Sequence, residues 1–253
     1  MTTQPAEGFD VARDDIPKGL VEAIAYDSKS IGITRRMVIY TPPGYAKDRE
    51  YPVLYLLHGI GDDEDGWYQK GSANIILDNL HADGIVEPMI VVMPNGRAAS
   101  GVTVRTPQKE QLPAFEAFEK DLLNDIIPLV EKRYSVKKER THRALAGLSM
   151  GGGQSLNFGL SHIDTFAWIG AFSLARNTKV ATKLVLDPDR VAKELRFLWI
   201  SCGDQDDLMR ISESYHSALS EMKVPHTWRV SSGGHTWTVW KSDLFFLSQR
   251  LFQ

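Results

Sequence analysis

A serine stands in the middle of a glycine-rich stretch whose spacing is typical of a nucleophile site. The stretch from Gly147 to Gly151 reads Gly-Leu-Ser-Met-Gly and matches the pattern G-x-S-x-G, in which a tight strand-to-helix turn holds the serine in a strained conformation. Glycine is expected at both ends of the pattern, because a side chain two residues from Ser149 would crowd the turn. The backbone N–H groups of the following helix would point at an oxyanion formed beside this serine. The stretch therefore predicts nucleophilic chemistry.

A serine nucleophile needs a base, and one of the seven histidines fits that role best. His235 follows the last predicted strand on a glycine-flexed loop, at the edge where α/β sheets place their sites. His226 precedes the same strand and so lies at the wrong end of the sheet. Four others fall on helices, a strand start or a helix-end turn: His81, His142, His162 and His216. We predict that His235 is the base.

The base needs an acid that orients it, and an acidic stretch follows the predicted strand ending at Cys202. Asp206 lies three residues after Gly203 and reaches beyond the strand end toward the histidine. Asp204 is the alternative acid. Asp207 is placed to cap the following helix.

A second oxyanion donor is expected from the loop after an early buried strand. The apolar run 52–57 ends in His58-Gly59-Ile60-Gly61, and in α/β-hydrolases the corresponding loop supplies an N–H group. Its position assigns this role to the N–H of Ile60. In α/β-hydrolases the serine comes first in the chain, then the acid and then the histidine. His58 precedes Ser149, so we interpret it as a structural residue that holds the loop by hydrogen bonds.

Hydrophobic patterns predict alternating strands and helices. A strand hairpin is expected over 21–40, and a long loop without periodicity over 96–113, at the active-site edge. The other expected strands are 52–57, 89–93, 166–172, 197–202 and 227–231, and the expected helices are 73–82, 114–134, 211–222 and 237–251. This order predicts an α/β fold with a mostly parallel sheet, helices on both faces and no large lid domain.

Composition narrows the classes of protein further. The chain has 253 residues and a net charge of -3, and it has no basic stripe of the kind that binds nucleic acid. No stretch approaches the roughly 18 apolar residues of a membrane span. We expect an irregular segment over 1–18 and a single catalytic domain over 19–253. The single cysteine, Cys202, is expected to be a core residue.

Two further expectations concern metal and location. The acidic residues 62–65 lack the alternation and the distal glutamate of a calcium loop, so we expect no metal there. The first ten residues lack the apolar region of a signal peptide. We favour a secreted protein whose leader has been removed, with a cytoplasmic protein as the alternative.

Several motifs together resemble a known superfamily over nearly the whole chain from about Gly19. They are Thr41-Pro42-Pro43-Gly44-Tyr45, Tyr51-Pro52-Val53-Leu54-Tyr55-Leu56-Leu57-His58-Gly59, Asp78-Asn79-Leu80, Val92-Met93-Pro94-Asn95-Gly96 and Gly147-Leu148-Ser149-Met150-Gly151-Gly152. The set resembles the esterase-D-like superfamily and, within it, carbohydrate esterase family 1, the feruloyl and acetyl-xylan esterases.

This resemblance implies an α/β-hydrolase fold without metal or organic cofactor. It implies Ser149, Asp206 and His235 as a catalytic triad, with the N–H groups of Ile60 and Met150 as the oxyanion hole.

The resemblance also implies ester hydrolysis through an acyl-enzyme, on feruloylated or acetylated xylan. S-formylglutathione hydrolases and siderophore esterases belong to the same superfamily and stay open as alternatives, as do an acyltransferase and a non-catalytic binding protein. Trp67, Trp237 and Asn95 are the candidates for substrate binding, whereas Trp240, inside the last helix, is expected in the core. No nucleic acid and no membrane is expected as a partner.

Overall fold

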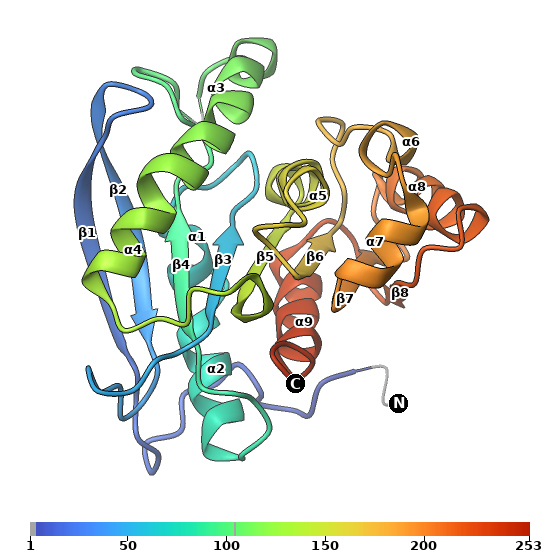
Figure 1. Cartoon of the computed structure of the whole chain (residues 1–253). Coiled ribbons are helices and arrows are strands. Elements are labelled where there is room, and N and C mark those ends of the chain that lie inside the picture. Colours follow the sequence, from blue (N-terminus) through green and yellow to red (C-terminus); the bar gives the residue numbers. More distant parts are fainter. Residues whose placement is uncertain (1–3, 104) are drawn as a thin grey trace.

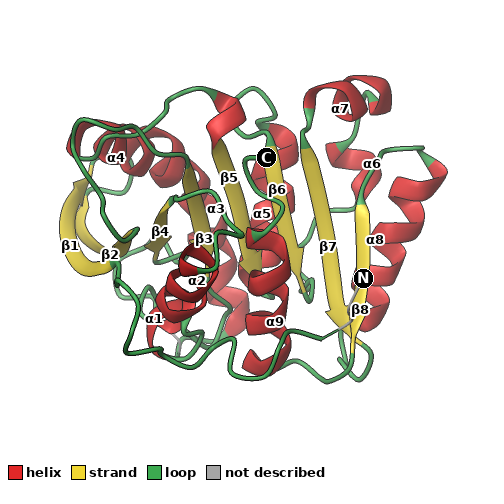
Figure 2. Ribbon diagram, turned by 90° about the horizontal axis from the view of Figure 1, so that it is seen from below, coloured by secondary structure: helices red, strands yellow, loops and turns green. Residues whose placement is uncertain are grey.

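A computed structural model describes residues 4–103 and 105–253. In this part of the chain, strands form an 8-stranded sheet in the order β1-β2-β4-β3-β5-β6-β7-β8, which Figure 2 shows from one end to the other. β1 (Leu20–Ser28) and β2 (Ile33–Thr41) form the expected antiparallel hairpin, and β2 also runs antiparallel to β4. The other neighbours are parallel: β3 (Val53–Leu57), β4 (Ile90–Pro94), β5 (Arg143–Leu148), β6 (Trp168–Phe172), β7 (Phe197–Gly203) and β8 (Thr227–Ser231). The predicted mostly parallel sheet is confirmed.

The central strands are apolar throughout because helices cover both of their faces. In β3, Leu54 and Leu56 enter one core, whereas Val53, Tyr55 and Leu57 enter the other. Side chains alternate between the faces of a strand, so a strand covered on both sides needs apolar residues at every position. This is why the sequence showed continuous apolar runs here and not an alternating pattern.

The helices divide between the two faces of the sheet (Figure 1). α1 (Gly66–Gln69), α2 (Ala73–Ala82) and α9 (Trp237–Ser248) share one hydrophobic core with the sheet. The helices that pack on the opposite face are α3 (Gln108–Asp121), α4 (Ile127–Arg133), α5 (Met150–Ser161), α6 (Ala181–Leu184), α7 (Pro188–Glu194) and α8 (Met209–Glu221). The described residues also include a π-helical turn, η1 (Leu122–Ile126), and a 3-10 turn, η2 (Arg140–His142).

The helix expected over 114–134 begins earlier than predicted. α3 starts at Gln108 and continues through Pro113, so the predicted loop 96–113 is shorter. Proline inside a helix loses a hydrogen bond and costs about 3 kcal/mol, so local preference alone does not favour a helix that continues through Pro113. Contacts with the loop after β4 hold this turn in place, since the N–H of Ala98 donates to the carbonyl of Ala114 at 2.9 Å. The other predicted strands and helices are present, with ends shifted by at most about three residues.

The N-terminal segment is irregular, as expected, but it is attached to α2. Residues 1–3 of the predicted segment 1–18 lie outside the described residues. The side-chain amide of Asn79 donates to the carbonyls of Phe9 and Val11 at 3.0 and 2.9 Å. Arg13 forms a salt bridge of 2.8 Å with Asp83. The irregular segment is therefore tied to the domain at residues 9–13. Among the described residues, no helix has the length and apolar character that crossing a membrane requires.

Candidate active site

Ser149 occupies the turn between β5 and α5 in a strained conformation. Its φ is +53°, a region that residues with a side chain rarely adopt. Glycines make this turn possible: a Cβ on Gly151 would lie 2.6 Å from the carbonyl oxygen of His58, and one on Gly147 would lie 2.7 Å from the backbone of Gly151. The predicted crowding around the serine is confirmed.

His235 and Asp206 lie with Ser149 in one hydrogen-bonded chain. The distance from His235 Nε2 to Ser149 Oγ is 2.9 Å, and from His235 Nδ1 to Asp206 Oδ2 it is 2.8 Å. A carboxylate only accepts, so Nδ1 carries the proton and Nε2 is left to accept from the serine hydroxyl. The side chain of Asp206 is 0% exposed and that of His235 is 31% exposed. The imidazole is therefore partly open to solvent, whereas the carboxylate is covered.

The carboxylate of Asp206 is held from several sides. Its Oδ1 accepts the N–H of Leu208 at 2.8 Å. Burial alone would raise the pKa of Asp206, but hydrogen bonds from His235 and from the N–H of Leu208 hold this pKa below its ordinary value. The group therefore stays ionised next to the imidazole.

The neighbouring aspartates have other partners. Asp204 accepts the N–H of Gly233 at 2.9 Å and so fixes the loop that carries His235. Asp207 does not cap α8, since the helix begins at Met209 and its N-cap, Leu208, makes no side-chain cap bond. The prediction of Asp207 as a cap was wrong.

Two further residues, Trp240 and Ser173, lie beside His235 and Asp206, and nothing in the sequence indicates that they act together. The ring of Trp240 lies edge-on to His235, with centroids 4.9 Å apart, and its Nε1 donates to Ser173 Oγ at 3.0 Å. Ser173 is fully buried after β6, and its hydroxyl helps to lower the pKa of Asp206. Trp240 is buried, as expected, yet it contacts His235 directly and is linked to the surroundings of Asp206 through Ser173. No sequence pattern marks Ser173, because its role depends on two distant segments.

Two backbone N–H groups near Ser149 make no hydrogen bond within the described residues. These are the N–H groups of Ile60 and Met150, the two predicted oxyanion donors. The next N–H groups of α5 are already used: Gly151 donates to the carbonyl of His58 at 3.1 Å and Gly153 to that of Ser149 at 3.0 Å. The arrangement leaves donors available for an oxyanion beside the serine.

His58 is structural, as predicted. Its Nδ1 bonds the carbonyl of Gly59 at 2.7 Å, and its Nε2 accepts the N–H of Gly96 at 2.9 Å. Burial, and then the nearby charge of Arg97, lower the pKa of His58 to about 4. The imidazole is therefore neutral, and both of its nitrogens serve the backbone.

Trp67 does not fit the predicted contact with substrate. Its side chain is 1% exposed, and its Nε1 donates to the carbonyl of Leu57 at 2.9 Å. The ring packs edge-on against Phe172 and Trp237, with centroids 6.2 and 5.2 Å apart. Trp67 is a core residue that links α1 to the sheet, because a large ring fills the space beside the end of β3 better than solvent would.

The other two substrate-binding candidates differ from each other. Trp237 is partly exposed at the start of α9, directly after the loop that holds His235. Asn95 is committed to other contacts: its Nδ2 donates to Glu64 at 2.8 Å and its Oδ1 accepts the N–H of Arg97 at 3.0 Å. Both residues are partly exposed, but the amide of Asn95 is already used in these two hydrogen bonds.

Among the acidic residues 62–65, three pair with cations of the protein: Asp62, Glu64 and Asp65. Lys70 bonds Asp62 at 2.5 Å and Arg36 bonds Asp65 at 2.6 Å, and the described residues contain no group of three metal-ligating side chains. Cys202 lies in the core, as expected, where burial raises the pKa of its thiol to about 12.

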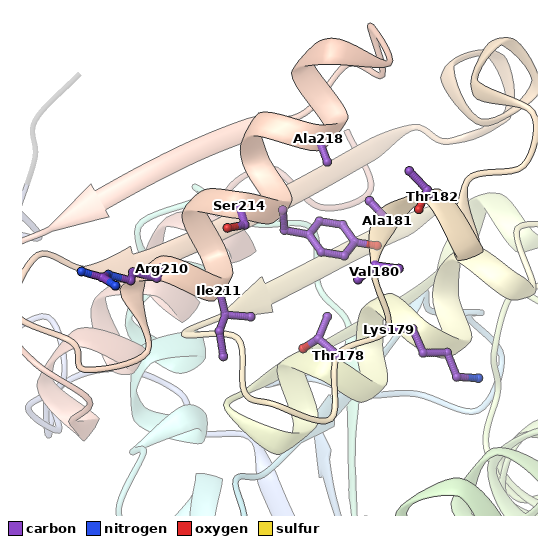
Figure 3. A pocket seen from close by; sticks show the side chains of 10 residues that line it. Thr178, Lys179, Val180, Ala181, Thr182, Arg210, Ile211, Ser214 and Ala218 are labelled. Carbon is purple, nitrogen blue, oxygen red and sulfur yellow. The ribbon is translucent and has the colours of Figure 1, made fainter.

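A separate pocket opens between the segment 178–182 and α8 (Figure 3). Its volume is about 430 Å³, and Val180, Ile211 and Ala218 give it a largely apolar lining. Ser149 and His235 do not line it. The pocket therefore lies between the segment that follows β6 and the helix that follows β7, and it is separate from the serine and histidine.

The fold, and the hydrogen-bonded serine, histidine and aspartate at the carboxyl edge of its sheet, are those of the α/β-hydrolases. Residues 28–251 match the model of a protein family described as "Putative esterase", and the chain belongs to this family.

Similar proteins narrow the comparison. An endo-1,4-beta-xylanase/feruloyl esterase of Xylanibacter ruminicola is 32% identical over 255 residues, which cover 98% of this chain and 33% of that protein. The chain thus spans a third of the length of this relative. A ferulic acid esterase of carbohydrate esterase family 1 from Anaeromyces mucronatus, in complex with ferulic acid, has a TM-score of 0.88 at 26% identity, covering 100% of this chain and 97% of that one. The predicted resemblance to carbohydrate esterase family 1 is confirmed.

The same fold extends to relatives with other names. An S-formylglutathione hydrolase of Staphylococcus aureus has a TM-score of 0.74 at 19% identity, with 96% of this chain and 100% of that chain covered. At this identity the likeness shows the fold alone.

Proposed function

We propose that the protein is a serine esterase that hydrolyses carboxylic esters on plant cell-wall polysaccharide, with feruloylated xylan as its main substrate. The observation that carries the proposal is the unbroken hydrogen-bonded chain from Ser149 through His235 to Asp206. Residues 19–253 form the catalytic domain in this proposal. Similarity to the xylanase/feruloyl esterase and to the ferulic acid esterase supports the choice of acyl group.

The proposed reaction passes through an acyl-enzyme. His235 Nε2 takes the proton of the Ser149 hydroxyl as Oγ attacks the ester carbonyl, and the N–H groups of Ile60 and Met150 stabilise the oxyanion. His235 then gives this proton to the leaving sugar oxygen. A water molecule, deprotonated by the same imidazole, attacks the acyl-enzyme and releases the carboxylic acid, which restores Ser149. Asp206 keeps the proton on Nδ1 throughout, so that Nε2 is free to accept.

The polysaccharide part of the substrate fits an open site. The imidazole of His235 is accessible, and the connection between β6 and β7 contains only the short helices α6 and α7. The exposed face of Trp237, next to His235, is the aromatic surface that we propose contacts the ferulate ring or a sugar ring. Acetylated xylan is a second substrate of the same chemistry.

The test is product release from feruloylated and acetylated arabinoxylan, with Ser149→Ala as the blank. We expect ferulate release by the wild type and a loss of at least ~10⁴-fold in the variant, whose fold is intact by circular dichroism. Acetate without ferulate would instead support an acetyl-xylan esterase. Turnover unchanged in Ser149→Ala would contradict the nucleophile assignment.

An esterase for small metabolites is the alternative within the same superfamily. An enterobactin esterase of Shigella flexneri shares the fold, with a TM-score of 0.75 at 23% identity, as does the S-formylglutathione hydrolase. If neither ferulate nor acetate is released, S-formylglutathione and siderophore esters are the next substrates to assay. A protein inactive on all of these esters would be a non-catalytic binding protein.

A further inference from the structure

Arg97 is a buried cation that forms no salt bridge among the described residues. Burial lowers its pKa, although the nearby charges of Asp63, Asp62 and Glu64 act to raise it. Arg97 lies in the loop after β4 and is 4% exposed. The guanidinium donates from Nε to Gln111 Oε1 at 2.9 Å, from Nη1 to the carbonyl of Asp62 at 2.5 Å, and from Nη2 to the carbonyl of Ile60. Buried charges are usually paired with an opposite charge. The hydrogen bonds of this guanidinium go mainly to two backbone carbonyls of one short loop.

The loop that receives these bonds is the one that carries the proposed oxyanion donor. In residues 59–62, the carbonyl of Gly59 also has donors, namely His58 Nδ1 at 2.7 Å and the N–H of Asp62 at 3.1 Å. A trans peptide points its N–H away from its C=O. Holding the carbonyl of Gly59 therefore turns the N–H of Ile60 in the opposite direction. Arg97 holds the next carbonyl, that of Ile60 itself, so the peptides on both sides of Ile60 are fixed.

The same loop touches the nucleophile. A Cβ added to Gly59 would lie 3.3 Å from the Cβ of Ser149 and 2.6 Å from a methyl group of Leu148. A small shift of the loop would change the position of Ile60 N–H relative to an oxyanion on the substrate, and such donors act only within about 2.7–3.1 Å.

We propose that Arg97 is a positioning residue for the oxyanion hole. It fixes Ile60 through the carbonyls of Ile60 and Asp62, and its charge, held out of water, adds to the stabilisation of the oxyanion. The inference rests on the proposed function, because it takes Ile60 N–H as an oxyanion donor. The competing interpretation is that Arg97 only ties the loop to α3 through Gln111. That role would affect the stability of the fold, but it would not make the protein bind the transition state more tightly than the ground state.

Binding of a transition-state mimic separates the two interpretations. Arg97→Met keeps much of the side-chain length but removes the charge and the donors. Phenylboronic acid, which adds to a serine as a tetrahedral anion, reports on the oxyanion hole. Methyl ferulate bound to the protein in a Ser149→Ala background reports on the ground state. We expect kcat on methyl ferulate and phenylboronate affinity to fall together by about 10- to 100-fold, less than the full loss of one donor, with methyl ferulate affinity within about threefold.

Two further variants separate charge from position. Gln111→Glu keeps an acceptor for Nε but sets a carboxylate against the guanidinium, and we expect kcat to fall about 3- to 10-fold while the loop stays in place. Lys70→Met is the matched control: it removes an exposed cation that pairs with the side chain of Asp62, and we expect less than a twofold change.

Specific outcomes would overturn the inference. Arg97→Met with kcat and phenylboronate affinity within threefold of wild type would do so, as would equal weakening of the boronate and of methyl ferulate. If Arg97→Met does not fold, Arg97→Lys replaces it, because one ammonium group cannot reach both carbonyls and the same selective loss is expected. A wild type inactive on every ester would instead overturn the proposed function, which is a different result.

Discussion

Two histidines on the same edge of the sheet have opposite environments. His58 follows β3, is buried, and uses both ring nitrogens for backbone groups of its own loop and of the loop after β4. His235 follows β8, is 31% exposed, and joins a carboxylate to a serine hydroxyl. The comparison shows that two imidazoles at one edge of a sheet can differ completely in hydrogen-bond partners and in solvent access. His58 holds two loops together, whereas His235 has the partners that the proposed base requires.

The largest effect should come from removing the open histidine. We expect His235→Ala to lower kcat by about 10⁴- to 10⁶-fold, because Ser149 then has no base. Its thermal midpoint should stay within a few degrees of wild type, since the side chain is partly exposed. Steady-state kinetics and a thermal melt of the same preparation test this. Residual activity within 100-fold of wild type would assign the base elsewhere.

The two candidate acids should differ by orders of magnitude. Asp206→Asn leaves the shape of the site but presents an amide to His235 Nδ1, which favours the wrong tautomer, and we expect a loss of about 10⁴-fold in kcat. Asp204→Asn is the matched control, because Asp204 bonds only the backbone of the same loop, and we expect less than a 10-fold loss. Equal losses in the two variants would contradict the assignment of Asp206.

The buried histidine should show itself in stability at acid pH. The unfolded chain protonates His58 below about pH 6.5, whereas the folded protein does so only near pH 4. Stability is therefore lost as the pH falls from about 6.5 to 4, by about 3 kcal/mol from this group.

His58→Gln, whose amide can still donate and accept, tests this contribution. We expect urea unfolding at pH 7 and pH 4.5 to show a smaller difference for the variant than for wild type. Other titrating groups, such as Asp62 and Asp63 beside this imidazole, are common to both proteins and cancel. The same pH dependence in both would contradict the assignment.

The smallest effect should come from the ring that supports His235. Trp240→Phe keeps an aromatic edge against the imidazole but removes the donor to Ser173. We expect kcat to fall about 3- to 10-fold, with KM unchanged, since one neutral hydrogen bond contributes about 1 kcal/mol. A larger loss would mean that Trp240 also fixes the position of the Ser173 hydroxyl, which helps to lower the pKa of Asp206.

Much of the fold could be predicted from the sequence because it depends on local patterns of apolar and glycine residues. Buried strands such as 52–57 are continuous apolar runs, and the elbow glycines flank Ser149 at fixed spacing. The start of α3 was missed because residues 96–113 show no clear periodicity, and contacts with the loop after β4 hold the helix through Pro113. Those contacts join segments far apart in the chain, and no single segment records them.

The candidate site divides in the same way. Ser149 and His235 lie in motifs with glycines, so their positions in the fold could be inferred from spacing. The prediction of Trp67 as a substrate contact was wrong, because the sequence pattern of a loop does not show whether an aromatic side chain faces solvent or the core. Arg97 was missed entirely, since its role depends on carbonyl groups, and every residue has one.

The strained turn at Ser149 has a consequence for the evolution of the protein. A residue with a side chain at φ +53° costs about 1–3 kcal/mol, which glycine at the same position would recover. Ser149→Gly should therefore yield a more stable and inactive protein. Selection for heat resistance alone would favour this change, so only selection for turnover keeps the serine in the population.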